Sequence, residues 1–122
     1  MPKALLAVRA EVPEADRARF EEWYATDHLP WAMRVFAARR AWRCWSRSDP
    51  AVHVAFYEFD SVEAAQATQT AEATKALVAD FDRVWQGRVT RRRAVLEVVQ
   101  ELTPYSGNNS CQDRQMAMRW LS

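Results

Sequence analysis

The amino-acid sequence predicts one α+β domain, built as a four-stranded antiparallel sheet with two helices on one of its faces. Segments with a two-residue alternation of apolar side chains, the period of a strand, lie near both ends of the chain and as a pair in its middle. Two segments with helical signals separate them. At 122 residues the chain has room for a single folding unit.

The first half of the chain predicts a strand followed by a helix. Residues 4–12, ALLAVRAEV, place small or apolar side chains at every second position. Pro13 then opens a segment with acidic residues in its first turn, as helix starts do. Within residues 13–28 one helical stripe carries Phe20, Trp23, Tyr24, Asp27 and His28.

Pro30 bears on the position of His28. A proline disfavours helical geometry at the residue before it, so we expect the helix to stop or kink at Leu29. That places His28 at a helix C-terminus, where the helix dipole and the neighbouring Asp27 favour its charged form.

The second half predicts a hairpin, a helix and a last strand. Residues 39–47 and 51–59 are strand-like, with a turn at Ser48-Asp49-Pro50 between them. Ser61 is the expected N-cap of a helix over residues 62–85, which we expect to bend or break near Thr70-Ala71. Residues 89–102 are rich in β-branched side chains and predict a strand.

The resulting order, βαββαβ, is that of the ferredoxin-like plait, which leaves one face of the sheet without helices. We expect a second copy of the chain to cover that face, because monomers avoid large exposed apolar patches. On the third strand the side chains predicted to face the helices are Val52, Val54 and Phe56. Those predicted to face away are His53, Ala55, Tyr57 and Phe59, joined by Leu5, Ala7, Arg9 and Glu11 from the first strand and by Val95, Glu97 and Val99 from the last.

Composition excludes several classes of partner. The 17 basic and 16 acidic residues nearly cancel, so no overall field attracts nucleic acid or an anionic membrane. We expect the run Arg91-Arg92-Arg93 to be solvated edge charges. Two distant cysteines, Cys44 and Cys111, and no expected signal peptide or membrane span favour a cytoplasmic location, and no cluster has the spacing of a metal site.

The segment FEEWYATDHLP and a histidine in the third strand resemble the dimeric α+β barrel superfamily, most closely its EthD-like branch. That branch commonly carries Trp/Tyr-x-x-x-His-x-Pro, matched here by Tyr24, His28 and Pro30. The resemblance spans residues 3–102 and implies a homodimer. We therefore expect a barrel domain over residues 1–102 and a C-terminal tail over residues 103–122 that is flexible or docks on the partner subunit.

The resemblance also implies a site. Methylmuconolactone isomerases of this superfamily pair a histidine of the helix with one of the third strand, and His28 and His53 are similar in placement. We expect these two to be catalytic, and the substrate-binding residues to be Tyr24, Trp31, Tyr57, Phe59 and Arg9. From the residues alone, a helix C-cap is the favoured role of His28, and only the motif match reverses this; His53 is equally a hydrogen-bonded structural histidine.

The function that follows is cofactor-independent proton transfer, of the isomerase or cyclase type, on a cyclic or aromatic carbonyl compound. The first alternative is a monooxygenase on the same scaffold, either cofactor-free or with a haem bound through His28 or His53. The second alternative is a non-catalytic module that binds a small molecule or serves as an accessory protein.

Overall fold

The computed structural model describes residues 2–104. Two elements in it are not α-helices or strands: η1 (Glu14–Asp16) is a short 3₁₀ turn and η2 (Tyr24–His28) is a π-helical turn. The others, in chain order, are β1 (Ala4–Glu11), α1 (Arg17–Trp23), α2 (Leu29–Phe36), β2 (Arg40–Trp45), β3 (Val52–Phe59), α3 (Val62–Ala67), α4 (Glu72–Trp85) and β4 (Thr90–Glu97).

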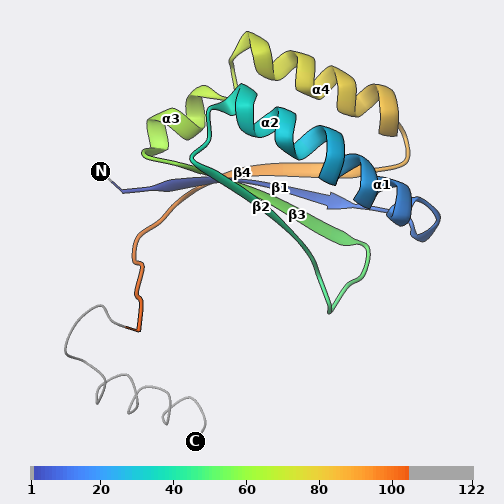
Figure 1. Ribbon diagram of the computed structural model, residues 1–122, viewed down its shortest axis with the longest axis horizontal. Coiled ribbons are helices and arrows are strands. Elements are labelled where there is room, and N and C mark those ends of the chain that lie inside the picture. The colour runs from blue at the N-terminus through green and yellow to red at the C-terminus, as the bar shows by residue number, and fades with distance from the viewer. Residues whose placement is uncertain (1, 105–122) are drawn as a thin grey trace, which may run out of the picture.

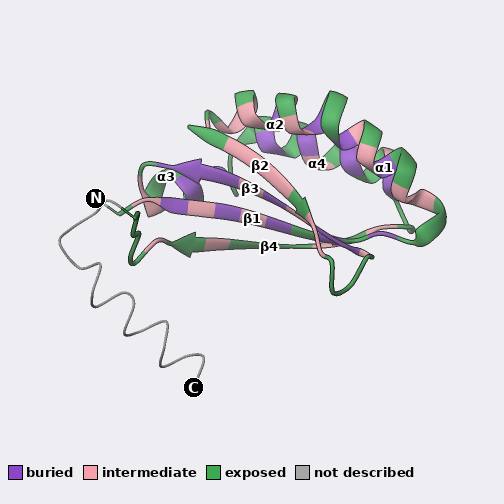
Figure 2. Ribbon diagram, turned by 60° about the horizontal axis from the view of Figure 1, so that its bottom comes forward, coloured by how far each residue is buried: buried purple, intermediate pink, exposed green. Residues whose placement is uncertain are grey.

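The predicted fold class is confirmed. The four strands form one sheet in the order β2-β3-β1-β4, and every neighbouring pair is antiparallel. All the helices lie on one face of this sheet, with α1, η2 and α2 as one rod and α4 beside it (Figure 1). The opposite face of the sheet, called the open face below, carries no helix from residues 2–104 (Figure 2).

The core lies between the helices and the sheet, where Figure 2 shows the buried positions. Phe20 is its centre: its ring lies 5.3 Å from that of Trp85 and 5.2 Å from that of Tyr24. Phe20 and Trp85 are both fully buried. Truncation of such a ring to alanine typically costs about 3–5 kcal/mol, so this aromatic cluster holds the helix layer to the sheet.

The predicted faces of β3 are wrong. The helices face one alternating set of β3 side chains, which are between 0 and 3% exposed: His53, Ala55, Tyr57 and Phe59. The other alternating set of the strand, which includes Val54, lies on the open face. The strand pairing agrees, because His53 lies opposite Ala10 and Tyr57 lies opposite Leu6, two core positions of β1. A histidine and a tyrosine are tolerated inside because aromatic rings surround both.

The other two face assignments have opposite outcomes. On β1 the predicted outward set is confirmed, since the core side chains are those between Leu5, Ala7, Arg9 and Glu11. On β4 the assignment is wrong, because Val95 lies opposite Leu6 and packs against the core. Arg91 and Arg93 share its parity and lie on the helix side of the sheet.

The first helix does not stop at Pro30. Its backbone stays helical from Arg17 to Phe36, and the π-turn of η2 absorbs the proline: the Leu29 N–H donates to the Tyr24 carbonyl, five residues back. His28 is therefore in the middle of a continuous helical rod and is not a C-cap. The rod ends at Ala37, which adopts a left-handed conformation with φ of 53°.

The predicted break in the second helix is confirmed, since α3 ends at Ala67 and α4 begins at Glu72. Ser61 is the N-cap, as expected, and its hydroxyl accepts a hydrogen bond of 3.1 Å from the Ala64 N–H. Most of the tail predicted over residues 103–122 lies outside the described residues.

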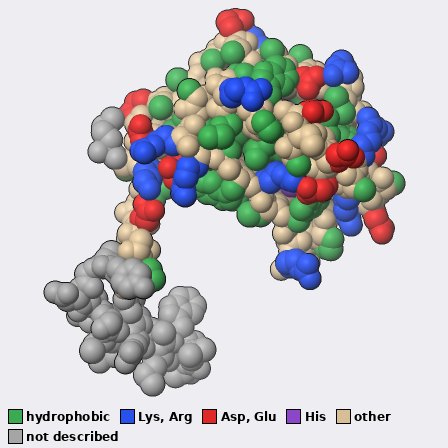
Figure 3. Space-filling model, in the orientation of Figure 1, with side chains coloured by type: hydrophobic (Ala, Val, Ile, Leu, Met, Phe, Trp, Pro, Cys, Tyr) green, Lys and Arg blue, Asp and Glu red, His purple; other side chains and the backbone are tan. Residues whose placement is uncertain are grey.

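On the face of the molecule that Figure 3 shows, acidic and basic side chains are interspersed, with hydrophobic ones between them. This fits the near balance of charge in the sequence. Among the described residues, no helix has the length and apolar character needed to span a bilayer.

Candidate functional site

His28 lines a small cleft between the helix layer and the sheet, called the His28 cleft below. Its free volume is about 20 Å³, room for roughly one water molecule. Polar groups converge there from η2, β3 and β4, with an apolar wall from β1, α2 and α4. The lining residues are Val8, Tyr24, His28, Phe36, Tyr57, Leu77, Arg91 and Arg93.

His28 is 7% exposed and held by aromatic rings. Its imidazole stacks on Trp23 with ring centroids 4.7 Å apart, and the edges of Tyr24 and Phe81 lie 4.8 and 5.8 Å away. Its Nδ1 is buried without a hydrogen-bond partner among the described residues. Burial, and next the positive charge of Arg91, lower the pKa of His28 to about 4, so the ring is neutral at pH 7. The expected charged form is therefore wrong.

Tyr24 and Tyr57 form a hydrogen-bonded pair in the floor of the cleft. Burial raises the pKa of Tyr24 to about 12 and that of Tyr57 well above its usual value, so both hydroxyls stay protonated at neutral pH. The Tyr24 ring contacts both histidines, with centroids 4.8 Å from His28 and 4.6 Å from His53. Tyr24 thus separates the two imidazoles.

Two arginines of β4 bring positive charge to the cleft. The Arg91 guanidinium lies 3.9 Å from the centre of the Phe81 ring and 3.3 Å from the Asp82 carboxylate. Burial, followed by repulsion from Arg93, lowers the pKa of Arg91. Arg93 has no ion pair among residues 2–104. The expected role of these arginines as solvated edge charges is wrong for Arg91, whose side chain is 15% exposed.

His53 is completely buried, on the other side of Tyr24. Its ring packs against Phe20 and Trp45 at 5.1 and 4.9 Å. The Arg43 guanidinium lies 3.4 Å from its Nε2, and because arginine only donates, this nitrogen is the acceptor and the proton is on Nδ1. Burial, and next the charge of Arg43, lower the pKa of His53 to about 4.

Behind His53 is an ion pair that sequence inspection missed. Glu21 of α1 accepts hydrogen bonds from both terminal nitrogens of Arg43 and, at 2.7 Å, from Trp45 Nε1. The Arg43 and Trp45 bonds lower the pKa of Glu21 to about 2. No spacing in the sequence links a helix glutamate to these β2 residues. The β4 arginines, in contrast, alternate with the same period as Val95 and so lie on the same face of the strand as this apolar residue. That spacing can be detected in the sequence.

The other predicted site residues are scattered. Phe59 is buried at the far end of β3, opposite Ala4, and Trp31 packs half-buried against the core from α2. Arg9 lies on the open face, where it pairs with Glu11 at 2.9 Å, so its placement gives no support to substrate binding. Of the predicted residues, His28, Tyr24 and Tyr57 share the cleft, while His53 lies behind Tyr24.

Chemically, the cleft combines a neutral imidazole, two phenol donors and two guanidinium groups. A neutral imidazole accepts a proton, whereas phenols and guanidinium groups stabilise negative charge that develops on oxygen. The described part of the chain contains no group of three or more His, Cys, Asp or Glu side chains placed to hold a metal ion.

The predicted ferredoxin-like fold is confirmed by solved structures that share no more than 20% identity with this chain, an EthD-family protein among them. No protein-family model and no curated protein sequence matches the chain. Among solved structures, an ethyl tert-butyl ether D (EthD) family protein from Bacillus halodurans is similar with a TM-score of 0.58 and 20% identity over 84% of this chain and 100% of its own.

Two further structures are similar. SnoaB, a cofactor-independent oxygenase from Streptomyces nogalater, has a TM-score of 0.61 and 17% identity, covering 84% of this chain and 98% of its own. A dimeric ferredoxin-like protein from an uncultured marine organism has a TM-score of 0.52 and 13% identity, covering 84% and 100%.

Proposed function

We propose that this protein is a cofactor-independent enzyme in which His28 removes an acidic proton from a cyclic or aromatic carbonyl compound. The observation that supports this most is the position of one neutral, buried histidine in a cleft that also holds two arginines. The free volume of the cleft is about 20 Å³, so binding of a cyclic substrate requires the cleft to open. The depressed pKa makes His28 a weak base, so the substrate must lose its proton readily, as a phenol or a carbon flanked by carbonyl groups does.

Deprotonation turns neutral His28 into imidazolium and the substrate into an enolate or phenolate. The Arg91 and Arg93 charges and the Tyr57 hydroxyl attract the new oxygen charge, and the adjacent anion in turn stabilises the imidazolium. Return of the proton from His28 to a different carbon completes an isomerisation. Attack of the enolate carbon on a second carbonyl of the same molecule completes a cyclisation, with the proton going to the new alkoxide.

A cofactor-free oxygenase is the second candidate, favoured by the similarity to SnoaB. In that reaction the deprotonated substrate reduces dioxygen: a CH₂ group becomes C=O, and the second oxygen atom leaves as water. The first step is the same proton removal by His28. The two candidates therefore differ only in whether dioxygen is consumed.

The haem version has little structural support. His53 is enclosed by Phe20, Tyr24 and Trp45, which leaves no side of its ring open to a porphyrin. One face of the His28 ring is covered by Trp23.

The decisive experiment is solvent deuterium exchange into a panel of small cyclic 1,3-dicarbonyl and hydroxyaryl ketone compounds, followed by NMR in parallel with oxygen consumption. We expect His28→Gln to slow exchange by roughly 10² to 10⁴, the usual size of a general-base contribution. Arg34→Ala, a change at an exposed arginine of α2, is the matched control. Exchange at the original rate in folded His28→Gln would refute His28 as the base, and lack of any exchange with the original protein would favour a binding module.

The proposed assembly is a homodimer joined through the open faces of two sheets, and the proposed location is the cytoplasm, where the free, exposed thiol of Cys44 would stay reduced.

A further inference from the structure

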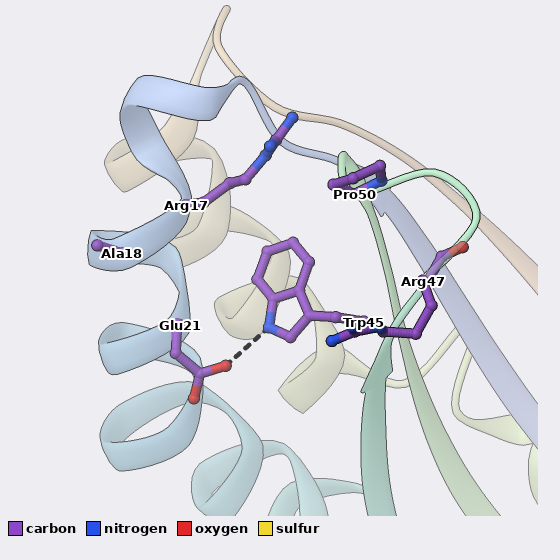
Figure 4. Close-up of a pocket in the computed structure, with 7 residues that line it drawn as sticks. Arg17, Ala18, Glu21, Trp45, Arg47 and Pro50 are labelled. Atoms are coloured by element: carbon purple, nitrogen blue, oxygen red, sulfur yellow. Dashed lines mark hydrogen bonds between the residues drawn. The ribbon is translucent and has the colours of Figure 1, made fainter.

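A second pocket, called the Trp45 pocket below, opens where α1 faces the loop between β2 and β3. Its volume of about 480 Å³ is within the roughly 300–1,000 Å³ usual for small-molecule sites. It shares no lining residue with the His28 cleft. The residues that matter here are Arg17, Glu21, Trp45, Arg47 and Pro50, which Figure 4 shows around the central indole.

The Trp45 indole is fixed in orientation. Its Nε1 donates to Glu21 Oε1 at 2.7 Å, the bond drawn in Figure 4. Inside the protein it makes edge contacts with Phe20 and His53, at 5.9 and 4.9 Å between centroids. The indole remains only half-buried. A ring already held in place offers a stacking surface at little cost in side-chain entropy.

The pocket has an excess of positive charge. Glu21 is neutralised by Arg43, to which it binds through both oxygens. Arg17 donates its Nε to the Val12 carbonyl at 3.1 Å, a bond that leaves its charge uncompensated. Neither Arg17 nor Arg47 has a carboxylate partner among residues 2–104. Arg17 extends from α1 and Arg47 from the hairpin, on the two sides of the indole (Figure 4).

We propose that the Trp45 pocket binds a planar aromatic carboxylate. The aromatic part stacks on the indole of Trp45, and the carboxylate supplies a negative charge to the guanidinium groups of Arg17 and Arg47, which lack one. Both requirements are needed together: a neutral ring leaves two positive charges unmatched, and a small aliphatic anion leaves the indole face in water. The proposal goes beyond the reaction at His28 and does not depend on it.

The test uses 2-naphthoate as the probe, with isothermal calorimetry for affinity and the indole N–H resonance of Trp45 for position. Absence of one resonance in Trp45→Leu identifies that signal among the six tryptophans. We expect saturable binding that shifts the Trp45 resonance. We expect Arg47→Ala, at an exposed position, to weaken binding roughly fivefold, as for loss of one ion pair. Trp45→Leu should weaken it roughly tenfold, as for loss of an aromatic contact.

Two controls separate charge and site. The uncharged 2-naphthamide should bind at least fivefold more weakly than 2-naphthoate, and Arg34→Ala should leave naphthoate affinity unchanged. Three results would overturn the proposal: no naphthoate binding at millimolar concentration, equal affinity for the amide, or affinity that falls in Arg93→Ala but not in Arg47→Ala, which would place the probe in the His28 cleft.

Discussion

The imidazole of His28 stacks on the indole of Trp23 with an angle of 19° between the two planes, although the residues are five positions apart in one helical rod. In a regular α-helix, positions three and four apart face each other. The π-turn over Tyr24–His28 adds the extra residue that brings position five into contact with position zero. The geometry of the proposed base therefore depends on this turn.

Pro30 supports the π-turn because it has no N–H to donate to a carbonyl four residues back. We predict that Pro30→Ala allows a regular helix, rotates His28 off Trp23, and slows proton exchange at least tenfold while the protein stays folded. Stability should be unchanged or higher by up to about 3 kcal/mol, since an interior proline is costly in a helix. Denaturant unfolding and the exchange assay measure the two effects. Unchanged exchange would mean that Pro30 has no part in aiming His28.

The two histidines should give the protein a characteristic acid sensitivity. Their pKa values are lowered from 6.5 to about 4, so as pH falls the unfolded chain takes up protons first. The contribution of the two histidines to the free energy of unfolding should thus be fully present above pH 6.5 and decrease between pH 6.5 and 4. Below pH 4 the histidines should cause little further change. Each histidine contributes at most about 3 kcal/mol to the fall. NMR titration should find both rings neutral at pH 5; a ring that titrates near pH 6.5 would contradict its burial.

The Tyr24–Tyr57 pair permits a test of the cleft floor. Tyr24→Phe leaves the Tyr57 hydroxyl without this partner, and Tyr57→Phe does the reverse, so each should lower the free energy of unfolding by about 1–3 kcal/mol. The double variant should cost less than the sum, because it leaves neither hydroxyl unmatched. Chemical denaturation of the three variants measures the coupling. Strict additivity would show that the two hydroxyls do not interact in solution.

The order of elements was predictable because each has a local signal, such as the Ser61 N-cap or the alternation in residues 4–12. The faces of β3 could not be predicted, because both of its alternating sets of side chains are largely apolar. The rule that polar side chains face outward then placed His53 and Tyr57 on the wrong face. Glu58 was the better guide, since its parity marks the open face. Its carboxylate is buried there in ion pairs with Arg40 at 2.9 Å and Lys3 at 4.0 Å.

The site itself was only partly predictable. The motif located His28, and its neighbour Tyr24 lies one turn away. The π-turn has no signature in a single sequence, so His28 was misplaced at a helix end and its charge state was predicted wrongly. Arg43 and Glu21 meet only because β2 passes α1 in the folded chain. Such long-range pairs depend on the assembled fold.

The open face predicts how two copies of the chain associate. Trp42 and Phe56 stack on it with centroids 5.5 Å apart, and Leu96 of the edge strand β4, on the same face of the sheet, is 43% exposed. Burying such faces against each other would remove roughly 2,000 Å² or more from water, the range of obligate dimers. We predict a dimer by light scattering at micromolar concentration, and a folded monomer for Leu96→Glu, because each interface would then bury two uncompensated carboxylates.

Ala76→Glu, which adds the same charge on an exposed position of α4, is the control and should stay dimeric. A dilute original protein that runs as a folded monomer would contradict the predicted association.

The His28 cleft is lined by residues of one protomer on the helix side of the sheet, whereas the sequence analysis placed the cavity on the uncovered side. We therefore expect the Leu96→Glu monomer to keep proton exchange within about twofold of the dimer. Loss of exchange on dissociation would show that the partner subunit contributes to the site after all.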